Sequence, residues 1–130
     1  MKNLVVAKFQ NGRLVKGFTQ DFSPKRSDFH IFPGNSVEAA EKIILTHLKA
    51  VFFVKTTTGN LKKGKPSSHS DSKRYGKLLE IEFFDGETIR GYAQIYNPRD
   101  VGFFMFPDDQ ESNNERIYII RKAARAIRSI

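Results

Sequence analysis

The sequence of 130 residues contains no cysteine and no tryptophan, and only five prolines. Without cysteine the chain has no disulfide framework, no thiol nucleophile and no cysteine-containing zinc site. No apolar run approaches the roughly 20 residues that a membrane-spanning helix needs. The first residues, MKNLVVAKFQNG, turn polar too early for a signal peptide. These absences predict a cytoplasmic protein that does not associate with membranes.

The composition is that of a folded chain, with 39% hydrophobic and 28% charged residues. Its length predicts one domain or two very small ones, and it is sufficient for a core that needs neither disulfides nor metal. Phenylalanine is unusually common, with twelve residues.

The net charge of +8 is concentrated in one short stretch. Residues 1–54 carry +4, residues 55–77 carry +6 and residues 78–130 carry −2. The middle stretch is rich in Gly, Ser, Thr and Lys and has little hydrophobicity, so we interpret it as a flexible connector. Its charge serves either the solubility of a linker or contact with a polyanion, and we favour solubility.

The two sides of this connector align with each other. Residues 5–33 match residues 79–107 at an offset of 74 without gaps, and the identities fall at turn and aromatic positions. Residues 41–54 and 115–130 continue the match with a small gap. The sequence therefore predicts an internal duplication, with a first repeat at 1–54, the connector at 55–77 and a second repeat at 78–130.

Each repeat is predicted to contain five short strands. Period-2 alternation of apolar residues begins each repeat, at 5–9 and 79–83. Asn11-Gly12 and Asp85-Gly86 supply the two residues with positive φ of a type I′ turn. The later strands are expected at 15–20, 29–32, 42–46 and 50–54, and at 89–95, 103–106, 116–120 and 126–130. A helix over residues 36–51 is the alternative there, and we expect at most a helical turn near Leu48 and Lys122.

Gly17 and Gly91 lie inside the second strands and indicate a sharp bend. Five short strands with a bent second strand are typical of a small, strongly bent β-barrel. The expected fold class is all-β, with two tandem five-stranded barrels.

The pattern of an alternating strand, an Asn/Asp-Gly turn and a strand with a central glycine resembles the Sm-like and Src-homology-type small barrels. The segments DFSPKRSDFHIFP, LKAVFFVK and YNPRDVGFFMFPDDQESNN are similar to an uncharacterised bacterial family built from this doubled unit. The bacterial family implies no activity, whereas a resemblance to Sm-like barrels implies RNA binding.

PilZ domains, which bind cyclic di-GMP, are small β-barrels with an R-x-x-x-R arm before the barrel and a [DN]-x-S-x-x-G turn inside it. Arg121-x-x-x-Arg125 has the first spacing but lies at the opposite end of the chain. Asp21-Phe22-Ser23 begins the second motif, yet Arg26 replaces its glycine. Cyclic di-GMP binding is therefore disfavoured.

Catalytic and metal-binding patterns are sparse. His30, His47 and His69 are far apart in sequence, and His30 aligns with Phe104, which indicates a packing role. The acidic run at residues 108–111 has no counterpart in the first repeat and is expected to be a solvated loop. We therefore expect a protein that is not an enzyme and holds no cofactor and no metal.

The expected function is a binding or adaptor module whose partner is a protein. Neighbours in a strand point to opposite faces, so one member of each adjacent aromatic pair must leave the core of its own repeat. The expected interface aromatics are Phe52, Phe53, Phe103 and Phe104. The alternative is RNA or single-stranded DNA binding through phosphate contacts, from Lys62, Lys63, Lys65, Lys73, Arg74, Arg121 and Arg125. The identity of the partner and the oligomeric state are left open by the sequence.

Overall fold

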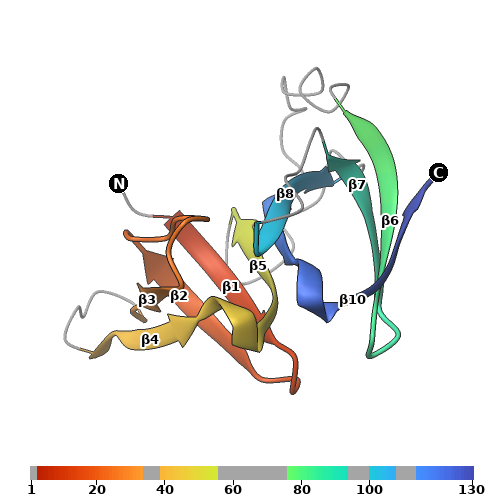
Figure 1. The fold of residues 1–130 in the computed structure, drawn as a ribbon. Helices are drawn as coiled ribbons and strands as arrows, with labels where there is room; N and C mark the ends of the chain where they lie inside the picture. The colour runs from red at the N-terminus through yellow and green to blue at the C-terminus, as the bar shows by residue number, and fades with distance from the viewer. Residues whose placement is uncertain (1–2, 34–38, 56–75, 94–99, 108–113) are drawn as a thin grey trace.

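The computed structural model describes residues 3–33, 39–55, 76–93, 100–107 and 114–130, and it is all-β (Figure 1). We call residues 3–55 the first half and residues 76–130 the second half. The strands of the first half are β1 (Asn3–Phe9), β2 (Leu14–Thr19), β3 (Asp28–Ile31), β4 (Glu41–Ile44) and β5 (Leu48–Val54), with the 3-10 turn η2 (Leu45–His47) before β5. Those of the second half are β6 (Lys77–Phe83), β7 (Thr88–Ala93), β8 (Gly102–Pro107), β9 (Asn114–Ile120) and β10 (Ala124–Ser129), with η4 (Arg121–Ala123) before β10. All the predicted strands are therefore present, and the helical turns fall beside Leu48 and at Lys122.

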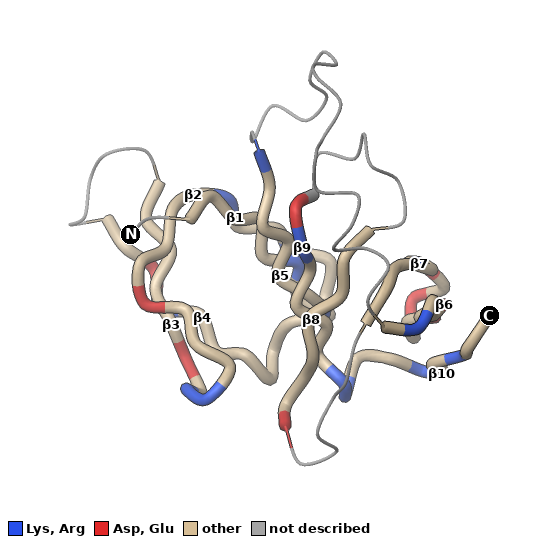
Figure 2. Tube along the Cα trace, turned by 90° about the horizontal axis from the view of Figure 1, so that it is seen from above, with Lys and Arg blue, Asp and Glu red and all other residues tan. Residues whose placement is uncertain are grey.

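One antiparallel sheet passes through both halves in the order β10-β6-β7-β8-β9-β5-β1-β2, and β3 and β4 form a second, two-stranded sheet. A single bridge between Phe18 and Phe32 connects the two sheets, with backbone hydrogen bonds of 2.9 Å in both directions. The strand pairings thus form a continuous series whose two ends are β10 and β4. In Figures 1 and 2 these two strands lie on opposite sides of the molecule.

The strand registers of the two halves correspond. Val5 pairs with Gly17 in the first half, and Leu79 pairs with Gly91 in the second. Likewise, His30 faces Lys42 where Phe104 faces Tyr118. Equivalent residues of the two halves are 74 positions apart up to β3 and β8, and they are 76 positions apart from β4 and β9 onward. The bulge in the pairing of the first and last strands of each half also recurs. It lies in β1–β5 where Phe9 is opposite Leu48, and in β6–β10 where Phe83 is opposite Ala124.

The expected type I′ turns are not formed, because among the described residues only glycines have positive φ. Gly12 and Gly86 have φ of 96° and 95°, whereas Asn11 and Asp85 do not reach the left-handed region. In the first hairpin the N–H of Gly12 donates to the carbonyl of Phe9 at 3.0 Å, and the N–H of Phe9 donates to Arg13 at 2.9 Å. This is a type I turn followed by a glycine bulge, the usual form of a slightly longer hairpin loop.

Gly17 and Gly91 are required by close backbone contact. A Cβ atom on Gly17 would lie 2.5 Å from the carbonyl oxygen of Phe32, and one on Gly91 would lie 2.4 Å from that of Phe106. Each glycine therefore lets the second strand of its half cross closely over the third. The sequence predicts a sharp bend at these two positions, and what the structure shows there is a close approach of backbones.

The prediction of two closed barrels is wrong. The outer edge of β5 pairs with β9 of the other half, with Val51 opposite Tyr118 and Phe52 opposite Ile117. Because this pairing occupies one edge of β5 and one edge of β9, neither half can close its own barrel through these strands. The halves are joined into one sheet instead.

Candidate functional site: the seam between the halves

The β5–β9 pairing, which we call the seam, separates two hydrophobic cores. Along β5, Ala50, Phe52 and Val54 face a core made mostly by the second half. Leu48, Val51 and Phe53 face a core made mostly by the first half. Every residue of β5 is buried. The two halves thus share their central strands, and each core includes side chains from the other half.

Two of the four predicted interface aromatics, Phe52 and Phe53, lie in the seam, and Phe103 and Phe104 lie beside it in β8, which pairs with β9. Phe52 and Phe103 belong to the second-half core and Phe53 to the first-half core, and these three are buried. Phe104 is half-buried and packs on the first-half core although it belongs to the second half. In the pairs Phe52-Phe53 and Phe103-Phe104, one member, Phe52 or Phe104, therefore packs against the other half of the same chain. Phe84 alone of the large aromatics is widely exposed in the described chain, with 69% of its surface accessible.

A cluster of aromatic rings packs under β5 and β9. The Phe22 ring meets Phe29, Phe53 and Tyr118 edge-to-face, with centroid distances of 5.1–5.3 Å. The guanidinium of Arg116 lies 4.4 Å from the ring centre of Phe53 and 5.0 Å from that of Phe104. Edge-to-face pairs and a cation over a ring each add to simple burial. This cluster fixes the first half to β9 of the second.

The hydroxyl of Tyr118 is buried and has no hydrogen-bond partner in the described structure. Burial raises the pKa of Tyr118 above its ordinary value of 10.0, and the charge of Asp100 acts in the same direction. The hydroxyl therefore stays neutral at physiological pH.

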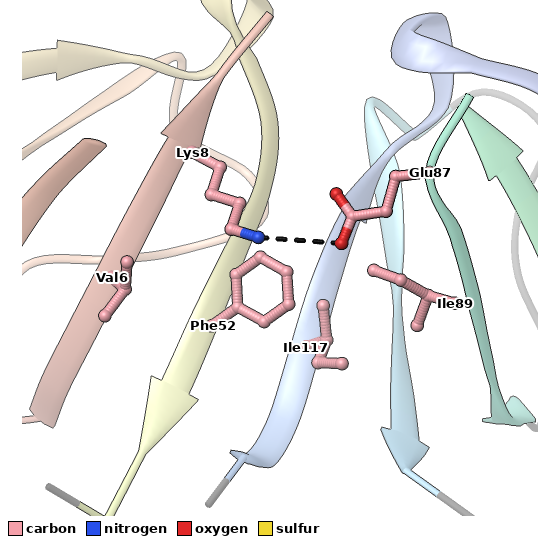
Figure 3. Close-up of a pocket in the computed structure, with 6 residues that line it drawn as sticks. All are labelled: Val6, Lys8, Phe52, Glu87, Ile89 and Ile117. Atoms are coloured by element: carbon pink, nitrogen blue, oxygen red, sulfur yellow. Dashed lines mark ion pairs between the residues drawn. The ribbon is translucent and has the colours of Figure 1, made fainter. Parts of the chain in front are cut away.

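An open cleft of about 270 Å³ lies beside the seam, between the two halves (Figure 3). Phe52 and Ile117 form its apolar floor, and Lys8 and Glu87 face each other across it, with Lys8 Nζ 3.6 Å from Glu87 Oε2. Val6 and Ile89 complete the lining. The cleft is near the lower size limit of small-molecule sites. It could hold a small amphiphilic group or one side chain of a partner.

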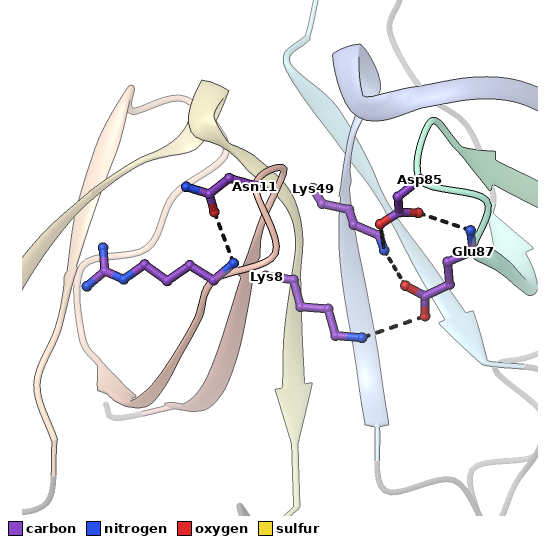
Figure 4. A network of polar contacts seen from close by, with 6 residues as sticks. Lys8, Asn11, Lys49, Asp85 and Glu87 are labelled. Carbon is purple, nitrogen blue, oxygen red and sulfur yellow. Dashed lines mark hydrogen bonds and ion pairs between the residues drawn. The ribbon is translucent and has the colours of Figure 1, made fainter.

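A buried lysine joins the halves above this cleft (Figure 4). Lys49 in β5 is only 5% exposed, and its Nζ donates to Asp85 Oδ2 at 2.7 Å and to Glu87 Oε1. Burial alone would lower the pKa of Lys49, but the bonds to Asp85 and Glu87 outweigh it and raise that pKa above 10.5. The bond from Lys49 lowers the pKa of Asp85. These two shifts favour the charged forms of Lys49 and Asp85, and the network fastens the β6–β7 hairpin to β5.

Sequence reasoning missed this network. Lys49 is the one charged residue within LKAVFFV, and a single charge inside an apolar strand indicates a partner across space. Asp85 was interpreted only as a turn residue, which it also is, since its Oδ1 accepts from the N–H of Glu87 at 3.0 Å. No local pattern shows that these carboxylates lie next to Lys49, 36 and 38 residues away.

The predicted phosphate-binding residues are only partly covered by the structure. Lys62, Lys63, Lys65, Lys73 and Arg74 lie outside the described residues. Arg121 lies in η4, where its Nε donates to the carbonyl of Asp100 at 3.4 Å and its guanidinium lies 5.8 Å from the ring centre of Phe103. Arg125 is exposed on β10. Neither arginine lines the cleft described above.

His30 is held by Asp21. Asp21 accepts the N–H of His30 at 2.9 Å and lies 2.9 Å from its ring Nδ1. Burial acts to raise the pKa of Asp21, but the bonds from His30 and Thr19 prevail and lower it. His69 and residues 108–111 lie outside the described residues. In the part of the chain that is described, no three His, Asp or Glu side chains gather in a way that could hold a metal ion.

No helix among the described residues has the length and apolar character required to cross a membrane. No curated protein and no solved structure matches the chain. One family model does match, over residues 1–130, and it is described as a family of unknown function, DUF6982. The chain, an all-β protein whose halves share a central seam, belongs to the DUF6982 family.

Proposed function

We propose that this protein is a non-enzymatic protein-binding module formed by two copies of one β-unit, and that it receives its partner by strand pairing. The matched registers of the two halves support the duplication, because four matched pairings with one shared two-residue shift follow naturally from a repeated unit. The fold itself carries no function. The proposal therefore rests on the surfaces that the fold leaves open.

The observation that carries the proposal is the pair of open edges. Within the described residues, the outer sides of β4 and β10 have no strand partner. An exposed edge presents a row of N–H and C=O groups that can pair with another chain. Apolar side chains remain exposed beside both edges, since Ile44 is 37% and Ile130 is 61% accessible. Backbone groups and apolar contacts together are what strand addition uses.

Nucleic-acid binding is the second candidate, and the connector with its +6 charge favours it. The described surface favours protein binding instead, because many of its cations already contact carboxylates at 4 Å or less. These cations are Lys8, Arg13, Arg26, Lys42, Lys49 and Arg128. A phosphate would have to compete with these carboxylates, whereas phosphate-binding faces rely on uncompensated charge.

The test is photo-crosslinking in cells that produce the protein. A photoreactive amino acid replaces Ser129, on the open edge of β10, and a matched variant carries it at Lys16, an exposed residue of β2. Protein adducts at position 129 that are absent at position 16 would support the proposal. Nucleic-acid adducts at position 129, or equal protein adducts at both positions, would overturn it.

The nucleic-acid candidate has its own assay. The electrophoretic mobility of RNA and single-stranded DNA is measured with the full chain and with a variant whose residues 56–75 form a neutral Gly/Ser link. We expect binding no tighter than the non-specific range of about 10⁻⁴–10⁻⁶ M. Submicromolar, salt-sensitive binding that the link abolishes would show that the protein acts on nucleic acid.

A further inference from the structure

We propose that the partner at the open edges is a second copy of this chain, with β10 of one copy pairing with β4 of the next. This inference rests on the proposed function and names its partner. It follows from the seam, in which β5 pairs with β9 inside the chain. β5 has the same place in the first half as β10 in the second half, and β9 has the same place in the second half as β4 in the first half. The contact inside one chain can therefore recur between chains.

The strand that ends the first half pairs with the fourth strand of the second half, so the seam joins two different surfaces of one unit. A head-to-tail contact of this kind leaves one unused surface of each type. The unused surfaces are β4 and β10, which are also the two ends of the series of paired strands. They lie on opposite sides of the molecule (Figure 2), as continued assembly requires.

We call the pairing of β10 of one copy with β4 of the next copy the junction. Its register follows from the 76-residue offset between equivalent residues of the two halves. In the seam Phe52 faces Ile117 and Val51 faces Tyr118. The corresponding pairs in the junction are Arg128 with Glu41 and Ile127 with Lys42 of the next copy.

The backbone groups on both edges fit this register. Ile130 N–H donates to Leu78 in β6, and Leu45 N–H donates to Ser27 beside β3, each at 3.0 Å. Because hydrogen-bonded positions alternate along an antiparallel strand, Ile127 of β10 and Lys42 of β4 turn their N–H and C=O groups outward. These are two residues that the register places opposite each other.

The charges of the junction are complementary at its centre. Arg128 would face Glu41, and Glu82 would approach Arg13, as Lys8 approaches Glu87 in the seam. Inside one chain Arg128 already contacts Glu82 at 2.5 Å and Arg13 contacts Glu41 at 2.6 Å. The junction would therefore place these four side chains in one row, in which positive and negative charges alternate. Opposite charges across neighbouring strands stabilise their pairing.

One position of the junction is unfavourable. Arg125 takes the place of Lys49, and the residues it would meet in the next copy are Asn11 and Arg13 instead of Asp85 and Glu87. The junction is therefore weaker than the seam, and its strength is tunable at this residue.

The exposed apolar residues of both edges gain a cover in the junction. Ile44 corresponds to Ile120, which is fully buried at the seam, and Ile130 corresponds to Val54, which is 7% exposed there. In the described single chain Ile44 and Ile130 are 37% and 61% exposed. Strand pairing would bury both against the neighbouring copy.

The experiment measures the mass of the purified full-length chain by sedimentation velocity at rising concentration. We expect species well above the monomer mass of 14.9 kDa, either a closed ring or a growing series. Arg128→Glu should weaken association roughly tenfold, because it places like charges opposite each other. Arg125→Glu, a matched change of the same charge on the same strand, should strengthen association, because it places a carboxylate near Arg13.

Three further variants guard against misfolding. Ile44→Ser changes a surface residue at the junction and should weaken association, whereas Phe84→Ser, on the β6–β7 turn, should not. Glu41→Arg and Arg128→Glu chains should each remain small alone but associate when mixed, since every junction between one variant and the other pairs opposite charges. Circular dichroism checks that each variant is folded.

A wild-type chain that stays monomeric at millimolar concentration would overturn the proposal. Equal effects of Arg128→Glu and Arg125→Glu would overturn it as well. If the chain is monomeric but position 129 crosslinks a different protein in cells, self-pairing fails while protein binding stands. Nucleic-acid adducts at position 129 would instead remove the proposed function itself.

Discussion

Phe52 and Phe53 are neighbours in β5, yet they lie in two different hydrophobic cores. Because β5 is buried on both faces, the stability of each half depends on the other. The seam is therefore the part of the fold whose loss would affect the entire molecule.

We expect Phe53→Ala to lower the free energy of unfolding by about 3–5 kcal/mol, the usual cost of truncating a buried phenylalanine. Both halves should lose hydrogen-exchange protection in the same transition. Phe84→Ala, at an exposed position, should change stability by less than about 0.5 kcal/mol. Loss of protection confined to residues 3–33 and 39–55 would contradict the shared core.

Lys49→Met should lower the free energy of unfolding by about 1–3 kcal/mol, since charge-assisted bonds to two carboxylates are lost. The cost stays at this level because Asp85 and Glu87 are exposed enough to be hydrated after the change. Denaturant unfolding of Lys49→Met and of Lys16→Met, an exposed control, measures the difference. Equal stability of the two variants would mean that the network does not fasten the hairpin.

The stability of the protein should decline at both ends of the pH range. The pKa values of Asp21 and Asp85 are lowered from 3.8, so their contribution is full above that pH and is lost as pH falls through the lowered values. The pKa of Lys49 is raised from 10.5, so its contribution is full below that pH and is lost as pH rises through the raised value. Thermal unfolding of Asp21→Asn should show a smaller acid decline than the native chain. An identical acid profile would exclude Asp21 as a source of the decline.

Gly17→Ala should destabilise the fold more than Gly12→Ala. A Cβ on Gly17 collides with the backbone of Phe32, which cannot move without disturbing β3, and such overpacking costs about 1–3 kcal/mol or more. A Cβ on Gly12 meets nothing within 4 Å and suffers only the left-handed backbone, at about 1 kcal/mol. Denaturant midpoints compare the two variants. The reverse order would show that β2 and β3 can separate at little cost.

Tyr118→Phe should leave stability unchanged or raise it by about 1 kcal/mol, because the buried hydroxyl has no partner in the described structure. Calorimetry of the variant provides the measurement. A loss of more than about 1 kcal/mol would reveal a hydrogen bond to this hydroxyl, for example through a buried water.

The strands could be predicted from the sequence, because alternation, turn residues and the match between the halves can be read from short stretches of the chain. The joining of the two halves into one sheet, in place of two closed barrels, could not be predicted, since the residues of β5 do not encode which of two similar fourth strands will pair with them. The placement of Phe52 against the second half was one of several outcomes that alternation alone allows. The Lys49 network was out of reach for a related reason, because its carboxylates come from a hairpin in the other half.

The seam also has a consequence for synthesis on the ribosome. Val51 pairs with Tyr118, so at about 5–20 residues per second β5 waits roughly 3–13 s for its partner strand to be made. During this interval the nascent first half presents an apolar strand with one open edge. Pairing at the seam is thereby delayed until β9 has emerged, and such long-range pairing is slow to form. A nascent chain with this exposed strand is a natural client for a chaperone that shields apolar segments.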